Sequence, residues 1–384
     1  MGHARLSPSA SGRWVHCPGS VTMEERFPET TRSEAAEEGT ASHFVGSETL
    51  SGRAIPAAGQ TAPNGVILTA EMVEAAEVYT EAVASAAPPG ALLQVEKPLR
   101  VGRVHADCWG TPDLWYFDPS SWTLHVWDYK YGFGIVEPFE NWQGICYATG
   151  ALDIVAANMG QPVGLIDQRV TVVIHIVQPR PFHIVGPVRE WKIPASDLRG
   201  YVNRLEASAA AALGENPRTI SGDYCRYCSA RHACPAAQKA AMFAVDYTDR
   251  AAAEELSPEA LAIELRTLQR AAKAIEYRLA GLESQAIAML QGGGFIPGFA
   301  IDSGKGRPAW TGTAAEVFAL GDMFGVNLRK PEEPVTPGQA KKAGIPADVV
   351  AALSESKGSG IKLVPTGNSL AAQVFKQSNG GKQS

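Results

Sequence analysis

Two aspartates and a lysine stand at the ends of a segment that has the composition of a β-hairpin. The arms between Gly110 and Lys130 are rich in aromatic and β-branched residues, and Asp118 to Ser121 have turn character. Asp128 and Lys130 are two residues apart, so their side chains project from the same face of a strand. Hairpin pairing can bring Asp113, which opens the first arm, near Asp128. Two carboxylates and an amine in one place can bind a divalent cation and prepare a water molecule for attack.

Other polar residues could join this group. His43 lies inside a predicted helix, where it could be a metal ligand or an ordinary surface or core histidine. Glu96 follows a short predicted strand and could be a third acid or an exposed strand residue, whereas Asp107 is a weaker metal candidate than Asp113. Gln143 and Tyr147 lie one turn apart on one face of a predicted helix. They could reach a phosphate or a base, or could be a surface glutamine and a half-buried tyrosine.

Three late cysteines form a second cluster of chemically active residues. Cys225 and Cys228 make a C-x-x-C pair, and Cys234 follows six residues later. This spacing is typical of metal or iron–sulfur ligation, and a disulfide framework is not expected in a reducing compartment. Three thiolates need a fourth ligand, for which Cys17 is the leading candidate and His232 the second. A zinc site would use the same spacing.

The elements that must position these side chains favour an α/β fold. The β-branched run at residues 169–178 predicts a buried strand. Further strands are expected at residues 92–99 and 187–193, and helices at residues 33–50, 69–86, 141–159, 197–213 and 257–290.

Length and composition set the broad class of protein. A chain of 384 residues with 45% hydrophobic and 19% charged residues can bury a substantial core and exceeds one average domain. The net charge of −6 argues against a uniformly basic surface but leaves room for a local basic groove. No stretch approaches the roughly 20 apolar residues of a membrane span, and the start has no apolar signal region. We therefore expect a cytoplasmic protein with no membrane partner.

The character of the chain changes near residue 245. The predicted helix from Ser257 has heptad-like apolar spacing, and residues 295–310 resemble a small hairpin that carries Lys305, Arg307 and Trp310. These three side chains could touch DNA, or the hairpin could be an ordinary surface feature. The predicted domains are residues 1–245, an accessory helical and hairpin region at 250–372, and a disordered tail at 373–384.

Over residues 5–240 these motifs together resemble the PD-(D/E)XK nuclease superfamily, in particular its RecB-like branch with an iron–sulfur cluster. His43 in Glu-Gly-Thr-Ala-Ser-His is similar to the helical metal-ligand histidine of that branch. Asp113 in Gly-Thr-Pro-Asp resembles its first acid, and Asp128-Tyr-Lys130 its D/E-x-K. Gln143-x-x-x-Tyr147 resembles its Q-x-x-x-Y motif. One position departs from the pattern, because the acid often found three or four residues after the histidine is replaced by Gly46 and Ser47.

The cysteines and the N-terminal segment extend the resemblance. Cys17 with Cys225, Cys228 and Cys234 resembles the split cluster in which one early cysteine joins three late ones. The opening Ser-Pro-Ser…Cys-Pro-Gly resembles phage and prophage members long catalogued only as a domain of unknown function. The fold implied is a restriction-endonuclease-like core, a central mixed sheet flanked by helices, followed by a mainly helical C-terminal extension.

The resemblance implies a metal-dependent DNA exonuclease in phage-type recombination or repair. His43, Asp113, Asp128 and the carbonyl of Tyr129 would hold Mg²⁺ or Mn²⁺. Lys130 would orient or help deprotonate the attacking water. Gln143 and Tyr147 would position the DNA strand, and Glu96 is a candidate extra acid. The cysteines would hold a structural [4Fe–4S] cluster, with zinc as the alternative.

Two rival functions use the same residues differently. A non-catalytic DNA-binding or recombination scaffold could keep the nuclease fold, but the intact acid–acid–lysine set argues against it. A redox protein built on the cluster would leave that set unexplained. The expected partners are DNA and a single-strand annealing or binding protein in the bacterial host cytoplasm. The C-terminal region could bind that protein, mediate self-association or guide DNA.

Overall fold

The computed structural model describes residues 4–28, 33–248, 256–301, 319 and 322–323. The chain divides into two units, residues 1–301 and 302–384. Residues 246–301 belong to the first of these units, and the domain boundary near residue 245 stays a prediction. Two predictions lie outside the described residues, namely the DNA contacts Lys305, Arg307 and Trp310 and the disordered tail.

A five-stranded mixed sheet forms the centre of the first unit, as the sequence predicts. Its strands lie in the order β1 (Gln94–Val95), β4 (Leu114–Asp118), β5 (Thr123–Tyr129), β6 (Thr171–Val177) and β7 (Val188–Pro194). Neighbours are antiparallel except β5 and β6, which are parallel. The predicted hairpin is β4–β5, with Leu114 opposite Trp127 and Asp118 opposite Thr123.

The strand expected at residues 92–99 is two separate strands. β1 ends at Val95, and β2 (Leu99–Arg100) pairs with β3 (Trp109–Gly110) in a small second sheet. Glu96 lies at the break, with a positive φ of 48° that few non-glycine residues adopt. The backbone therefore leaves the main sheet at this residue.

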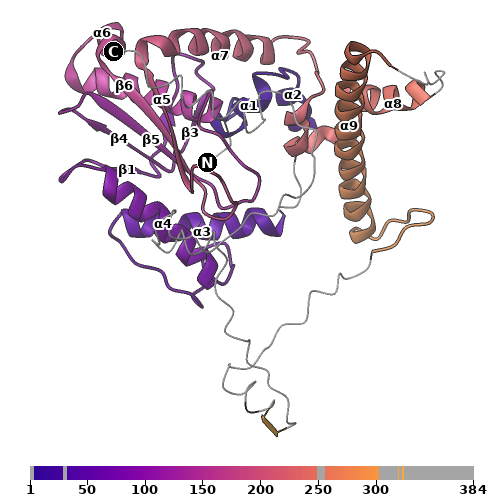
Figure 1. Cartoon of the computed structure of the whole chain (residues 1–384), viewed down its shortest axis with the longest axis horizontal. Coiled ribbons are helices and arrows are strands. Elements are labelled where there is room, and N and C mark those ends of the chain that lie inside the picture. The colour runs from indigo at the N-terminus through magenta and orange to yellow at the C-terminus, as the bar shows by residue number, and fades with distance from the viewer. Residues whose placement is uncertain (1–3, 29–32, 249–255, 302–318, 320–321, 324–384) are drawn as a thin grey trace. The chain divides into compact units, whose positions relative to one another are not determined.

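Helices cover both faces of the main sheet (Figure 1). One face carries α5 (Trp142–Met159), α6 (Val163–Arg169) and α7 (Arg199–Ala212), and the other carries α3 (Glu34–Leu50) and α4 (Ala70–Ala86). The alternation along β5 explains this division, because Leu124 and Val126 are buried against the first set and Trp127 and Tyr129 against the second. Asp128 is two residues after Val126 in β5, so it lies on the face of the sheet that carries α5.

Close packing and caps place the helices. Ser33 and Asn141 cap α3 and α5 by accepting backbone hydrogen bonds from Ala36 and Gly144. A side chain at Gly144 would lie 2.6 Å from Ile174, which explains how α5 approaches the sheet so closely.

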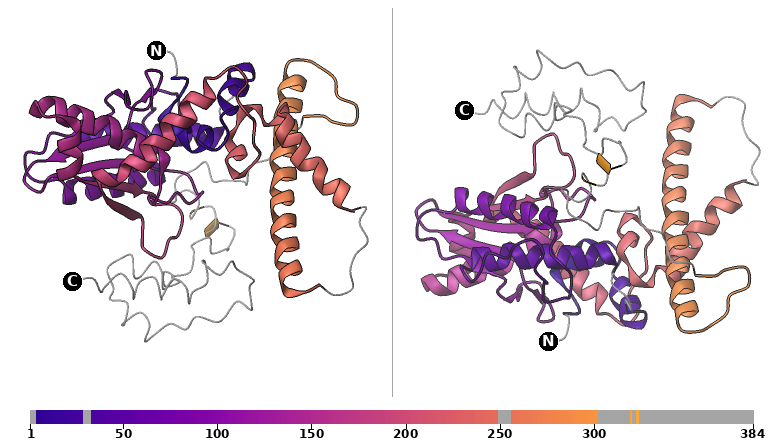
Figure 2. Two further views of the ribbon diagram at one scale, coloured as in Figure 1. Left: turned by 90° about the horizontal axis from the view of Figure 1, so that it is seen from above. Right: turned by 90° about the horizontal axis from the view of Figure 1, so that it is seen from below.

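Eight further helical elements complete the described part of the chain. They are η1 (Pro8–Ala10), α1 (Ser11–Trp14), α2 (Ser20–Arg26), η2 (Ala195–Leu198), η3 (Asp223–Tyr227), η4 (Ser229–His232), α8 (Pro235–Thr248) and α9 (Pro258–Gln291). α8 and α9 lie against each other in both views of Figure 2. None of the helices within the described ranges is long and apolar enough to cross a membrane.

Candidate active site

Three side chains from separate elements meet at one end of the β4–β5 hairpin. His43 comes from the middle of α3, Glu96 follows β1, and Asp113 precedes β4. Each offers a ligand atom, and the three atoms lie within 4.8 Å of one another. His43 Nδ1 is 3.2 Å from Asp113 Oδ1. One imidazole and two carboxylates form a donor set suited to a divalent cation such as Mn²⁺ or Mg²⁺.

The backbone around these ligands is held in place by named contacts. Ser42, next to His43, is buried and lies 2.7 Å from the Tyr129 hydroxyl, and it also donates to the carbonyl of Met72. The Glu96 N–H donates to the carbonyl of Asp113, while its left-handed backbone turns the chain out of the sheet. A non-glycine residue in this conformation costs energy and is characteristic of functional sites.

Charge coupling sets the protonation of the three ligands. Burial alone would raise the pKa of Asp113, but His43, Lys130 and the Tyr129 N–H outweigh it and lower that pKa. Burial alone would lower the pKa of His43, but the Asp113 carboxylate outweighs it, so the pKa of His43 is raised. Desolvation and, to a smaller extent, the negative charge of Asp113 raise the pKa of Glu96 to about 7. The Glu96 side chain nevertheless has solvent access.

A second network of three residues lies beside this group. Lys130 Nζ donates to Asp128 Oδ1 at 3.0 Å and to Gln143 Oε1 at 3.2 Å, and Gln143 Nε2 donates to the same Asp128 oxygen at 2.9 Å. Asp128 Oδ2 is also 3.0 Å from the ammonium but is buried and accepts no hydrogen bond. Both charged residues of the D-x-K motif therefore contact the glutamine of the Q-x-x-x-Y motif.

The charges of this network favour a protonated lysine. Burial alone would lower the pKa of Lys130, but Asp128 and Asp113 outweigh it and raise that pKa. Burial raises the pKa of Asp128 in spite of the ammonium beside it. The structure thus brings together His43, Asp113, Asp128, Lys130 and Gln143, with Glu96 rather than Asp128 completing the compact group of ligand atoms.

Tyr147 has a different neighbour from the one expected. Its ring is buried, and its hydroxyl donates to the carbonyl of Thr111 at 3.2 Å. A side chain at Gly110 would lie 2.9 Å from the Tyr147 oxygen and 3.0 Å from Pro8. Tyr147 therefore holds the Gly-Thr-Pro-Asp segment that presents Asp113.

Two loops beside the site were not recognised from the sequence. They follow β5 and β6, at residues 131–140 and 178–187. The buried Gln178 joins them, because its amide nitrogen donates to the carbonyls of Gly132 and Gly134 at 2.8 Å and its oxygen accepts from Val136 N–H. Arg189 donates to the carbonyl of Val136 and to Gln178. Except for the bond between Arg189 and Gln178, these hydrogen bonds span more than 40 residues of sequence, so local patterns do not reveal them.

The two loops joined by Gln178 expose aromatic and aliphatic side chains to solvent. Phe133 is 63% exposed, Phe182 is 75% exposed and Ile184 is 72% exposed. The guanidinium of Arg180 lies over the rings of Tyr131 and Phe133, at 4.3 and 4.1 Å. We call Phe133, Phe182 and Ile184 the apolar rim. Its sequence signal is the pair of Gly- and Pro-rich breaker segments that directly follow β5 and β6.

The four predicted cluster cysteines line one cavity although Cys17 is more than 200 residues from the others. All four are buried and unpaired. Backbone N–H groups point at two of the sulfur atoms, with Ile220 N 3.2 Å from Cys17 Sγ and Gly222 N 3.4 Å from Cys225 Sγ. Such hydrogen bonds stabilise thiolate ligands.

Four cysteine thiolates can hold either one zinc ion or an iron–sulfur cluster. The second candidate ligand, His232, has its Nδ1 3.1 Å from the carbonyl of Ser229 and stacks edge-on with Phe27.

Comparison with known proteins gives a family and a weak structural likeness. A crystal structure of a proposed exonuclease from Eubacterium rectale is 12% identical, with a TM-score of 0.35, and the match covers 66% of this chain and 90% of that one. A likeness at this level assigns neither a fold nor an activity. The model of the DUF2800 family, described as a protein of unknown function, matches residues 3–328, which is most of the chain. The chain therefore belongs to the DUF2800 family.

Proposed function

We propose that this protein is a metal-dependent deoxyribonuclease of the PD-(D/E)XK type, acting as an exonuclease. The observation that carries the proposal is the meeting of two networks, the ligand group His43, Glu96 and Asp113 and the Asp128–Lys130–Gln143 network. The 2.7 Å hydrogen bond from Tyr129 N–H to Asp113 Oδ2 joins them. A structural salt-bridge cluster would explain Asp128 and Lys130, but not a group of three convergent ligand atoms beside them.

The donor set fits a divalent cation. His43, Glu96 and Asp113 would hold it, and the unsatisfied oxygen of Asp128 is a further donor within the same charge network. A bound Mg²⁺ or Mn²⁺ would polarise the scissile phosphate and lower the pKa of a bound water. Without a cation, Glu96 would be about half protonated near neutral pH, because its pKa is about 7. A cation would favour its ionised form.

The raised pKa of Lys130 defines its role. A protonated amine cannot accept a proton from water. Lys130 would instead donate hydrogen bonds to the attacking water and to the phosphate oxygens, and its positive charge would stabilise the negative charge on those oxygens. Asp128 holds that ammonium in place, and Gln143 fixes the carboxylate through its amide. Of the two roles expected for Lys130, orienting the water is therefore favoured over deprotonating it.

The apolar rim supports a DNA strand end as the substrate. Aromatic faces stack on nucleobases without reading sequence, and bases are accessible in single strands and at frayed ends. Phe133 and Phe182 are exposed on loops that start directly after the strands that end at the site. Gln178 and Arg189 keep these loops in one conformation, so little ordering entropy is lost when a strand binds.

The cysteine cavity suits a structural cluster. Cys17, Cys225, Cys228 and Cys234 would hold a [4Fe–4S] cluster, with a single zinc ion as the alternative. The cluster would join the N-terminal turns to the end of the nuclease core. Phage-type recombination, in partnership with a single-strand annealing protein, is the context that the resemblance to prophage members implies.

Linear duplex, linear single-stranded and circular single-stranded DNA test the proposal. Each is incubated with protein in Mg²⁺, Mn²⁺ or EDTA, and the products are separated from bound complexes on gels. We expect the linear substrates to be degraded from their ends only when a metal is present, with the circles left intact. Binding without cleavage in every metal condition would instead support the non-catalytic scaffold.

A further inference from the structure

Tyr79 carries a buried hydroxyl that pairs with none of the described residues. The side chain projects from the middle of α4 and is 3% exposed. Its oxygen is buried and has no hydrogen-bond partner in the part of the chain that the structure describes. A buried hydroxyl without a partner lowers stability, and phenylalanine would fill nearly the same volume without this penalty. A polar atom in such a position therefore needs a functional explanation.

Close neighbours fix the ring of Tyr79 next to the ligand group. The ring stacks on that of Tyr129, with centroids 5.0 Å apart and an angle of 5° between the planes. The Tyr129 ring is also 5.0 Å from the imidazole of His43. A side chain at Gly46, three residues after His43 on α3, would lie 3.0 Å from the Tyr79 ring. The missing side chain at Gly46 therefore gives the ring its place against α3, one turn from a candidate metal ligand.

The negative charges of the site act on the Tyr79 hydroxyl. Burial raises the pKa of Tyr79 well above its ordinary value, and the carboxylates of Asp113, Glu96 and Asp128 raise it further. The hydroxyl is therefore protonated at neutral pH. A neutral O–H close to carboxylates is suited to donate a hydrogen bond to one of them.

Glu96 offers the acceptor for this hydroxyl. Both oxygens of the Asp113 carboxylate are already engaged, one by the Tyr129 N–H and the other by His43 Nδ1. The pKa of Glu96 is set by burial and by neighbouring charges, with no hydrogen bond among the causes. Within the described part of the chain, its carboxylate therefore has acceptor positions to spare, and its ligand oxygen lies within 4.8 Å of those of His43 and Asp113.

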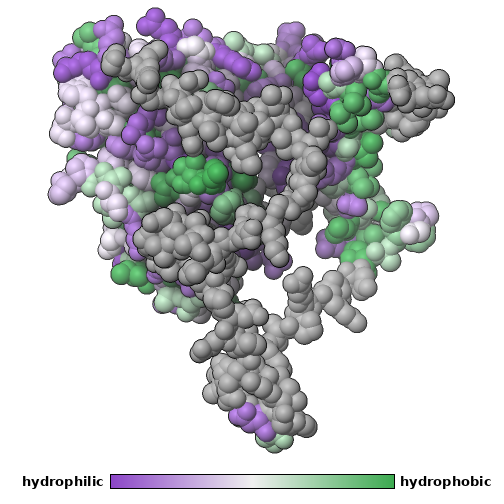
Figure 3. Space-filling view, viewed as in Figure 1, coloured by the Kyte–Doolittle hydropathy of each residue, from purple (hydrophilic) through white to green (hydrophobic). Residues whose placement is uncertain are grey.

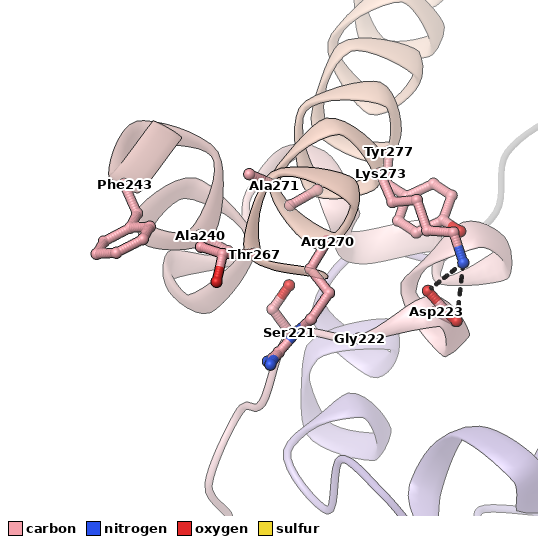
Figure 4. Close-up of a pocket in the computed structure, with 11 residues that line it drawn as sticks. Ser221, Gly222, Asp223, Ala240, Phe243, Thr267, Arg270, Ala271, Lys273 and Tyr277 are labelled. Atoms are coloured by element: carbon pink, nitrogen blue, oxygen red, sulfur yellow. Dashed lines mark hydrogen bonds and ion pairs between the residues drawn. The ribbon is translucent and has the colours of Figure 1, made fainter. Parts of the chain in front are cut away.

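Surface features of α9 offer no site of this kind. The helix exposes hydrophobic side chains at several places along its length, at the right of Figure 3. Figure 4 shows a pocket lined by residues 221–223 and by side chains of α8 and α9, in which Lys273 already donates to both carboxylate oxygens of Asp223. No described side chain that lines this pocket has a buried polar atom without a hydrogen bond. Tyr79 has such an atom beside a candidate cation site.

We propose that Tyr79 is a positioning residue whose hydroxyl donates a hydrogen bond to the Glu96 carboxylate when the ligand group holds a divalent cation. The proposal rests on the proposed function, since it requires that His43, Glu96 and Asp113 bind that cation. A hydrogen bond of this kind orients a ligand carboxylate and favours its ionised form. Tyr79 therefore acts on DNA cleavage through the affinity of the site for its cation.

The affinity of the full-length protein for Mn²⁺ tests the proposal, measured by isothermal titration calorimetry after dialysis to remove divalent cations. Tyr79→Phe keeps the ring and removes the hydroxyl, so the dissociation constant should rise about tenfold. Tyr116→Phe is the matched control. The Tyr116 hydroxyl is also buried without a partner among the described residues, but the charge that acts on it is that of Asp118, at the far end of β4. This control should bind Mn²⁺ as the wild-type protein does.

A double-mutant cycle with Glu96→Ala tests the acceptor. Glu96→Ala should bind Mn²⁺ more weakly than the wild-type protein, because a ligand is lost. Adding Tyr79→Phe should weaken binding no further, because the hydroxyl has lost its acceptor. A further tenfold loss in the double variant would overturn Glu96 as the partner of Tyr79. Wild-type affinity in Glu96→Ala would place the bound Mn²⁺ outside the ligand group and overturn the proposed cation site.

Urea unfolding without divalent cations separates this role from a structural one. The midpoints of Tyr79→Phe and Tyr116→Phe should equal or exceed that of the wild-type protein, since each variant loses a buried hydroxyl that lacks a partner. A lower midpoint for Tyr79→Phe, an unchanged affinity for Mn²⁺, or an equal loss of affinity in Tyr116→Phe would overturn the proposal and leave the proposed function standing. A folded wild-type protein that binds no Mn²⁺ would overturn both.

Discussion

The Tyr129 N–H and the Asp113 carboxylate are joined by a 2.7 Å hydrogen bond between the end of β5 and the start of β4. The second oxygen of Asp113 is 3.2 Å from His43. One carboxylate thus couples the helical histidine to the strand that carries Asp128 and Lys130. The charges of this site act as a unit, because each of these groups shifts the pKa of the others.

Asp113→Asn should remove activity and keep the fold. The amide oxygen can still accept the Tyr129 N–H, but the negative charge that favours a cation is lost. We expect cleavage to fall by more than about 100-fold and the affinity for Mn²⁺ to fall with it. Asp118→Asn is the control, because Asp118 accepts turn hydrogen bonds at the far end of β4. Equal cleavage by the two variants would contradict the role of Asp113.

Lys130→Met should lower both activity and stability. It leaves the carboxylate of Asp128 buried without its ammonium, which costs about 2 kcal/mol or more of the free energy of unfolding. The double variant Lys130→Met/Asp128→Asn removes that uncompensated charge, so urea unfolding should show stability recovered while cleavage stays absent. A double variant less stable than Lys130→Met would mean that the two residues are not coupled.

The apolar rim should contribute to DNA affinity and not to the chemical step. Phe133→Ala and Phe182→Ala should each weaken binding to single-stranded DNA by about 1 kcal/mol, or roughly fivefold, measured by fluorescence anisotropy in EDTA. The rate at saturating DNA should change little. Leu165→Ala is the matched control, because Leu165 is an exposed apolar residue on α6. The same loss of affinity in this control would remove the rim from the binding site.

Cys17→Ser should abolish the cluster. Protein purified without oxygen should be brown and contain iron in the wild-type form, whereas the variant should be colourless. The variant should also be less stable by about 3 kcal/mol or more, because the cluster closes a long loop of chain. Cys108→Ser, at a buried cysteine outside the cavity, should keep the colour. Stoichiometric zinc and no iron in the wild-type protein would replace the cluster with a zinc site.

His175 should make stability depend on pH below neutrality. It is buried beside His125, stacks on Trp127 at 3.8 Å, and burial lowers its pKa to about 3. Between that value and the ordinary pKa of about 6.5, the unfolded chain binds one more proton, so stability falls as pH falls, by up to about 1.4 kcal/mol per pH unit. His175→Gln should flatten this slope in urea unfolding.

The half-exposed His105 supplies the control for that experiment. His105→Gln should keep the wild-type slope between pH 6.5 and pH 4. A slope in His175→Gln as steep as in the wild-type protein would show that other groups cause the pH dependence.

Local sequence patterns predicted the strands and turns whose formation depends on neighbouring residues in the chain. The β4–β5 hairpin follows from alternating aromatic and β-branched residues around a turn, and the buried strand β6 follows from its β-branched run. The D-x-K spacing alone places Asp128 and Lys130 on one face. The approach of His43 and Gln143 to that face was expected only from the resemblance, because periodicity does not determine which helix covers which part of a sheet.

The features of the site that the sequence did not predict depend on contacts between residues far apart in the chain. The left-handed backbone at Glu96, which completes the ligand group, leaves no mark in the hydrophobic pattern. The brace formed by Gln178 and the stack of His125 on His175 follow from the parallel pairing of β5 and β6, which residue spacing cannot supply. The helical spacing places Tyr147 on the same face as Gln143, but it does not show that the Tyr147 hydroxyl bonds the carbonyl of Thr111.

Cleavage of end-labelled linear DNA tests the central claim most directly. The wild-type protein, Asp113→Asn and Asp118→Asn are compared in Mg²⁺ and in EDTA, with folding verified by circular dichroism. We expect shortened products from the wild-type protein and Asp118→Asn in Mg²⁺, none from Asp113→Asn and none in EDTA. Intact DNA in every lane with folded wild-type protein, or equal cleavage with and without metal, would contradict it.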